Sequence, residues 1–121
     1  MFDLEETFSF EAGHILTHHD GRCRNPHGHS YVMIVHIRGT ELVKSGPKTN
    51  MIIDFYDVIN VVKPMIDQYF DHKWLNDTLK SDSVTVEYMA KWIFDYLEKK
   101  IEGLHAITVC ETPTSRVKYS K

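Results

Sequence analysis

The sequence predicts the α+β fold class, with an antiparallel sheet and two helices packed on one of its faces. Segments near both ends of the chain alternate apolar and polar residues, which is typical of half-buried strands. Between them, apolar residues recur every three or four positions, which is typical of amphipathic helices. The chain has 121 residues, a length that favours a single domain covering residues 1–121.

The strands follow from the alternating stretches. A loop rich in His, Asp, Gly and Arg separates the first two strands, and Pro113 marks the turn between the last two. Every second position of the first strand is occupied by one of four residues whose side chains therefore share a face: Phe8, Phe10, Ala12 and His14. The expected ranges are 5–14 and 28–39 with the loop 15–26 between them, then 106–111 and about 117–119.

Two helices fill the middle of the chain. Asp54 is a suitable N-cap for the first, which is expected to run to about Phe70. Pro64 lies inside this stretch and is predicted to kink or split the helix. The second helix is expected to begin after Thr85, another suitable N-cap, and to stop before Gly103.

A candidate metal site lies at the start of the second strand, in His27-Gly28-His29. Alternate strand residues point the same way, so these imidazoles are roughly 6.6 Å apart at their Cα atoms. His14 can meet them if the first two strands pair antiparallel. A lone histidine is more often a surface or core residue, but this arrangement favours a metal. Three imidazoles with an open position are typical of catalytic zinc.

Other polar residues admit both functional and structural interpretations. Cys23 lies between two arginines, which favour the thiolate, so it can be a base, a nucleophile, a fourth zinc ligand or an inert loop residue. The carboxylate of Asp71 can orient the imidazole of His72, although a surface turn explains such a pair more often. Glu111, at a strand end, is either a solvated edge charge or a ligand contact. Cys110 is expected in the core.

Composition excludes several classes of protein. The net charge of −3 argues against a sequence-independent nucleic-acid binder. No apolar run approaches the ~20 residues that span a membrane, and the acidic N-terminus lacks a signal-peptide pattern. With two cysteines there is no disulfide framework, so a cytoplasmic location is expected. Exposed sheet edges are usually paired or covered, which favours an oligomer.

Together these segments resemble the 6-pyruvoyl-tetrahydropterin synthase / 6-carboxy-tetrahydropterin synthase family. The resemblance runs from Phe8 to Tyr119 in matching order and spacing. An isolated His-Gly-His would be weak evidence, whereas the ordered set is specific. The matching segments are Phe8 through His14, Cys23 through Tyr31, Ile53-Asp54-Phe55, Phe70 through Asn76, Thr85-Val86-Glu87 and Cys110-Glu111-Thr112.

The resemblance implies the tunnelling fold, a four-stranded antiparallel sheet with two helices. Three such sheets join into a barrel and two trimers stack into a homo-hexamer, with active sites between subunits. The site residues are implied as follows: zinc ligands His14, His27 and His29; catalytic Cys23; the proton relay Asp71 and His72; and the pterin contacts Glu111 and Thr85.

The implied substrate is 7,8-dihydroneopterin triphosphate. In the carboxy branch, a zinc-dependent lyase converts it to 6-carboxy-5,6,7,8-tetrahydropterin, acetaldehyde and triphosphate for queuosine (deazapurine) biosynthesis, a tRNA modification pathway. The short gap between Cys23 and His27 resembles this branch. The alternatives are the pyruvoyl synthase reaction on the same substrate, a zinc hydrolase of another small substrate, and a pterin-binding module without turnover. The resemblance does not identify the residues that bind the triphosphate.

Overall fold

A computed structural model describes all residues, 1–121, and contains one five-stranded sheet with the strand order β3-β1-β2-β4-β5. The four longer strands are antiparallel to their neighbours, and the two-residue strand β3 runs parallel to β1. The strands are β1 (Phe2–His14), β2 (His27–Gly39), β3 (Lys73–Trp74), β4 (Leu104–Thr112) and β5 (Ser115–Ser120). The α+β class is therefore confirmed, and β3 corrects the expected four-stranded, wholly antiparallel sheet.

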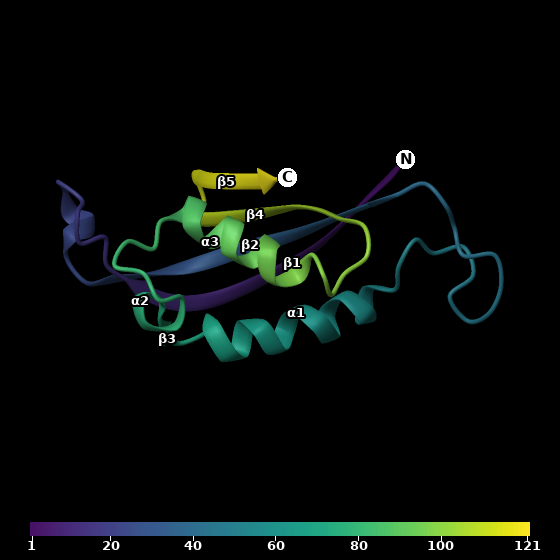
Figure 1. Cartoon of the computed structure of the whole chain (residues 1–121), viewed down its shortest axis with the longest axis horizontal. Helices are drawn as coiled ribbons and strands as arrows, with labels where there is room; N and C mark the ends of the chain where they lie inside the picture. The colour runs from purple at the N-terminus through teal and green to yellow at the C-terminus, as the bar shows by residue number, and fades with distance from the viewer.

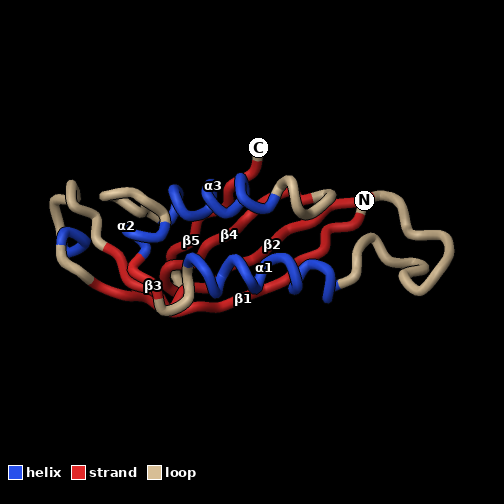
Figure 2. The backbone as a smooth tube through the Cα atoms, turned by 60° about the horizontal axis from the view of Figure 1, so that its bottom comes forward, coloured by secondary structure: helices blue, strands red, loops and turns tan.

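Two long helices, α1 (Phe55–Tyr69) and α3 (Val86–Leu97), lie across the same face of the sheet (Figure 2). Their apolar stripes pack on the side chains of alternate strand residues and form one cluster of 22 buried residues. Asp54 caps α1 by accepting a hydrogen bond from the Tyr56 backbone N–H, 2.8 Å long. Thr85 caps α3 by accepting one from the Tyr88 backbone N–H at 3.0 Å. Both caps were predicted.

Three details differ from the prediction. Helix α1 runs without interruption through Pro64, so the expected split is wrong. Pro64 is on the exposed side of α1, where water can satisfy the Asn60 carbonyl that loses its partner. A short third helix, α2 (Leu75–Thr78), follows β3 and was not predicted. Helix α3 ends at Leu97, several residues before the expected stop at Gly103.

The other face of the sheet carries no helix and is called the open face. It presents the alternate residues of each strand, among them Glu11, Ser30, His36 and Lys118. The loops 15–26 and 40–54 lie at opposite ends of the sheet (Figure 1). No helix has the length and apolar character needed to cross a membrane.

Candidate metal centre and active site

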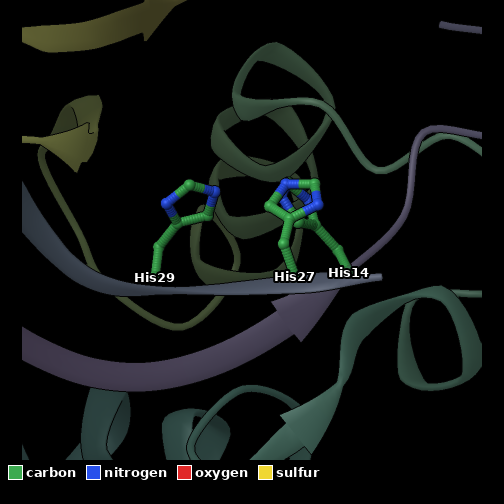
Figure 3. A group of neighbouring side chains, drawn as sticks. All are labelled: His14, His27 and His29. Carbon is green, nitrogen blue, oxygen red and sulfur yellow. The ribbon is translucent and has the colours of Figure 1, made fainter. Parts of the chain in front are cut away.

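The register of the first two strands brings the three predicted histidines together. His14 pairs with His27, and Ala12 pairs with His29, so all three imidazoles stand on the helix-covered face of the sheet (Figure 3). Gly28 lies between the two β2 ligands and faces the open side, as expected. The antiparallel pairing that the sequence required for this meeting is therefore confirmed.

The three rings are close enough to share one ion. One nitrogen from each of His14, His27 and His29 lies within 4.8 Å of the others. The ring centroids are 4.4 Å apart for His14 and His27, 5.0 Å for His27 and His29, and 5.2 Å for His14 and His29. Three imidazole nitrogens converging at one end of a sheet can hold a transition-metal ion and leave a position open.

Hydrogen bonds behind the rings orient two of the three ligands. The Nδ1–H of His14 donates to the Val84 carbonyl at 2.8 Å, and that of His27 donates to the Asn25 carbonyl at 2.7 Å. A carbonyl accepts only, so each ring must carry its proton on Nδ1 and present an unprotonated Nε2. Such bonds are the usual outer support of metal-binding histidines.

The metal-facing nitrogens meet the requirement for a ligand set. The Nε2 atoms of His27 and His29 are buried without any hydrogen-bond partner. Burial also lowers the pKa of His14 and, as the largest of several causes, the pKa of His29, which keeps both rings neutral and their lone pairs available. Buried polar atoms without partners are rare, and a bound metal ion would satisfy these two.

Tyr31 forms the floor of this centre, and the sequence analysis missed its role. The ring is fully buried, stacks on Phe10 at a centroid distance of 5.2 Å, and places its hydroxyl 3.3 Å from His14 Nε2. Burial raises the pKa of Tyr31 far above its usual range, and the nearby Glu111 adds to the shift. The signal in the sequence was its position two residues after His29, on the same strand face.

Glu111 also reaches the centre. It ends the inward-facing series of β4, and its Oε1 lies 3.6 Å from His29 Nε2. The side chain is 23% exposed, so the carboxylate stands at the mouth of the site with one side open to solvent. Of the two interpretations that the sequence allowed, the structure favours a contact within the site over a solvated edge charge.

Cys23 lies beside the centre, in a 3-10 turn, η1 (Arg22–Arg24). The thiol is free and half-buried, and it does not belong to the converging nitrogen set. Its backbone carbonyl accepts a hydrogen bond of 2.8 Å from the Leu16 N–H, which anchors the turn to the segment directly after His14. Its charge is the third cause, after burial and Glu111, of the raised Tyr31 pKa, so it lies within electrostatic reach of the centre.

Asp71 and His72 form a close carboxylate–imidazole pair at the free edge of β1. Asp71 accepts the Glu11 backbone N–H at 3.0 Å, and His72 Nδ1 lies 3.1 Å from the other carboxylate oxygen. The Glu11 N–H is the largest cause, and His72 the second, of a lowered Asp71 pKa. His72 adopts a left-handed φ of 58°, a conformation that non-glycine residues rarely adopt without a surrounding constraint.

The pair does not meet the histidine centre within one chain. His72 lines an open groove of about 480 Å³ together with Glu11, Ser30 and Lys73, and His29 of the histidine centre also borders this groove. Glu11 and Ser30 are adjacent in sequence to Ala12 and His29, so their side chains point to the opposite face of the sheet. The groove therefore opens mainly on the open face. The predicted relay pair therefore borders the open face, whereas the three imidazoles converge on the helix-covered face.

Thr85 approaches the centre indirectly. Its side-chain oxygen caps α3, and the preceding residue, Val84, supplies the carbonyl that orients His14. The Thr85 hydroxyl donates its hydrogen to no group of this chain, so that hydrogen is available for another contact. Sequence reasoning did not reveal the role of Val84, because it acts through a backbone carbonyl that any residue could supply. Asn76 lies in a segment that matches the family, but its role depends on hydrogen bonds to backbone groups distant in sequence, which the residue type does not show.

The fold and the centre define a class: α+β proteins with a three-histidine, metal-type site at one end of an antiparallel sheet. A family model described as 6-pyruvoyl tetrahydropterin synthase matches residues 3–121. The chain belongs to this family, as the resemblance in its sequence indicated.

Curated relatives and a solved structure agree with this assignment. The chain is 41% identical to a 6-carboxy-5,6,7,8-tetrahydropterin synthase of Synechocystis sp., over 98% of this chain and 93% of the relative. It is 35% identical to a protein of the same name from Haemophilus influenzae, with both chains fully covered. The structure of Caenorhabditis elegans 6-pyruvoyl tetrahydropterin synthase superposes with a TM-score of 0.84 at 27% identity, covering 99% of this chain and 95% of that one.

Proposed function

We propose that this chain is a single-domain, zinc-dependent 6-carboxy-5,6,7,8-tetrahydropterin synthase, a carbon–carbon or carbon–oxygen lyase. It would convert 7,8-dihydroneopterin triphosphate to 6-carboxy-5,6,7,8-tetrahydropterin, acetaldehyde and triphosphate. The observation that carries the proposal is the convergence of three imidazoles, two of them with buried Nε2 atoms that lack a partner. Curated relatives at 41% and 35% identity bear this enzyme name, which supports the choice of reaction.

His14, His27 and His29 would hold the zinc ion through Nε2. When bound, zinc makes the hydroxyl groups and adjacent C–H bonds of the substrate side chain more acidic. The carbonyls of Val84 and Asn25 keep two of the rings in the tautomer that a metal requires. Nitrogen ligands and an open position fit zinc better than the all-oxygen sites typical of magnesium or calcium.

Cys23 and His72 would move the protons. The Cys23 thiolate would act as a base at the substrate side chain, and His72, oriented by Asp71, would act as the partner acid. Glu111 would accept hydrogen bonds from the amino-pyrimidine edge of the pterin, and the Thr85 hydroxyl would donate a further bond to the ring.

This division of roles requires more than one chain, because His72 faces the open side of the sheet. We propose a homo-hexamer of two stacked trimers, in which the relay pair of one subunit completes the site of another. Glu11 directs its backbone N–H and C=O away from β2. Glu5, Thr7 and Ser9 direct their backbone groups the same way and leave them unpaired at this edge. A groove of about 360 Å³ lies there beside α1.

The other free edge, β5, has complementary charge. Arg116 and Lys118 face the open side, whereas the open side of β1 carries Glu5 and Glu11. Pairing β5 of one subunit with β1 of the next would bring opposite charges together and would leave no exposed edge in a closed ring. We propose no nucleic-acid or membrane partner, a cytoplasmic location, and a role in queuosine biosynthesis through the carboxypterin product.

Product identification tests the reaction. The zinc-loaded protein is incubated with 7,8-dihydroneopterin triphosphate, products are separated by liquid chromatography and mass spectrometry, and acetaldehyde is assayed alongside. Carboxytetrahydropterin with equimolar acetaldehyde is the expected result. A pyruvoyl product without acetaldehyde would refute the carboxy branch and establish the pyruvoyl synthase reaction, which the likeness to the Caenorhabditis elegans structure makes the second candidate.

A zinc hydrolase or a pterin-binding module would give a different pattern. Simple hydrolysis by metal-bound hydroxide does not need a thiolate, so Cys23→Ala would retain activity in a hydrolase and lose it in a synthase. A binding module would bind the pterin without producing acetaldehyde in either form of the protein.

A further inference from the structure

The side chain of Asn76 joins two backbone segments that are distant in sequence. Its Oδ1 accepts the Ile15 N–H at 2.8 Å, and its Nδ2 donates to the carbonyls of Ile15 at 2.9 Å and Ser81 at 3.0 Å. One N–H and two carbonyls surround the amide, so only this orientation satisfies all of its contacts. The half-buried side chain therefore links the two segments through its three hydrogen bonds.

The first of these segments connects His14 to Cys23. Ile15 directly follows His14, and the next residue, Leu16, donates its N–H to the Cys23 carbonyl at 2.8 Å. Holding both peptide groups of Ile15 thus fixes the backbone between a metal-type ligand and the turn that carries the thiol. Because the two bonds to Ile15 close a ring, neither residue can rotate without breaking one of them.

The second segment supports the His14 ring. Ser81 begins a short loop that reaches Val84, whose carbonyl accepts the Nδ1–H of His14. The loop also pairs with the first segment through a bridge between Leu16 and Ser83. Asn76 therefore acts on His14 twice, through the backbone that follows it and through the loop that supplies its ring acceptor.

We propose that Asn76 is a positioning residue that fixes the His14 imidazole and the Cys23 turn in position relative to each other. It contacts neither of the two side chains and acts through the peptide groups of Ile15 and Ser81. The inference concerning catalysis rests on the proposed function, whereas the geometric part, the fixed orientation of the His14 ring, is independent of it.

The test compares Asn76→Asp with Thr78→Val. An aspartate keeps the acceptor for the Ile15 N–H but turns an anionic oxygen toward two carbonyls, so it removes two bonds and adds repulsion. Thr78 lies in the same short helix, is equally half-buried, and donates its hydroxyl to the Tyr69 carbonyl at 2.7 Å. Its substitution removes one local bond without affecting either segment. Asn76→Ala serves as a second variant if the aspartate impairs folding.

The first readout uses the metal-free protein and does not depend on activity. The proton on His14 Nδ1, held by Val84, is expected to give a slowly exchanging signal in the imidazole region of a ¹⁵N-edited NMR spectrum. Asn76→Asp is expected to lose this signal or exchange it rapidly, whereas Thr78→Val is expected to retain it. An unchanged signal in both Asn76 variants would overturn the proposal.

The second readout is zinc affinity, measured by competition with a chromophoric chelator. Loss of outer support commonly weakens metal binding 10–100-fold, so a decrease of about that size is expected for Asn76→Asp and less than about 2-fold for Thr78→Val. Equal affinities for wild type and Asn76→Asp would overturn the proposal. If the wild type binds no zinc, the proposed function fails at its metal, and the NMR comparison still decides the role of Asn76.

Discussion

Acidification of the metal-free protein should lower its stability well above the pH at which carboxylates titrate, because burial keeps histidines neutral in the folded state. Burial is the largest cause of the lowered pKa of His14, His29 and His36. In the unfolded chain each ring binds a proton near its ordinary pKa of about 6.5. As pH falls below that value, the unfolded state gains protons that the folded state excludes, so stability decreases.

The magnitude follows from the number of protons taken up on unfolding. One excluded proton lowers the free energy of unfolding by about 1.4 kcal/mol for each pH unit between the unfolded and folded pKa values. His14 is 1% exposed, so it should contribute close to a whole proton. His29 and His36 are more accessible and should contribute less. The carboxylates with lowered pKa values, Asp54 and Asp71 among them, act only below about pH 4.

The assay is urea denaturation in the presence of EDTA at several pH values from 7.5 to 5, with stability plotted against pH. The slope of the unfolding free energy against pH reports the number of protons taken up on unfolding. His14→Gln is expected to reduce this number by about one, whatever its effect on the stability itself. The matched control, Val35→Ala, removes buried apolar volume and should lower stability by 1–3 kcal/mol, roughly the range for such changes, without altering the slope. A slope unchanged by His14→Gln would refute the claim that this ring is held neutral by burial.

Three further predictions concern the site, the fold and the assembly. Cys23→Ala should keep its zinc content by metal analysis but lose 10²–10⁴-fold in product formation, roughly the contribution of one acid–base group; full activity would exclude Cys23 as the base. Gly103→Ala should destabilise the protein by about 1–2 kcal/mol in urea titrations, because φ is +82° and a Cβ would meet the Arg38 carbonyl at 2.9 Å; a neutral result would contradict that backbone geometry. Lys118→Glu should shift the mass measured by light scattering toward the monomer, since it would oppose Glu5 and its neighbours at a β5–β1 edge, and a wild-type protein that is itself monomeric would refute the between-subunit site.

Local patterns in the sequence were sufficient to predict the ligand geometry. Strand alternation placed His14 on the inward face that it shares with Phe10 and Ala12, and the antiparallel pairing on which the prediction depended sets His14 opposite His27. A one-residue slip would have turned all of these side chains to the open face and exposed the apolar ones, so burial specifies the register strongly. The same reasoning predicted both helix caps, because an N-cap depends on one side chain and the next few backbone groups.

Contacts between distant backbone groups were beyond such reasoning. Strand β3 has two residues and forms because the His72 N–H donates to the Glu11 carbonyl at 2.6 Å, an interaction without any periodic signal. The support that Asn76 gives to Ile15 is of the same kind. Pro64 was misjudged for a different reason: the sequence shows that the proline removes a donor, but only the packing shows that the freed carbonyl is on the solvent side.

The position of the Asp71–His72 pair connects the chemistry to the assembly. Within one chain, the pair borders the groove on the open face, whereas the imidazoles of the histidine centre converge on the helix-covered face. The pair is nevertheless held firmly, by two backbone contacts to Glu11 and by a left-handed conformation at His72. This restraint fixes a largely exposed imidazole at the edge where, in the proposed assembly, a neighbouring chain would pair. The edge that the isolated chain leaves unpaired is therefore also the edge at which a second subunit would complete the site.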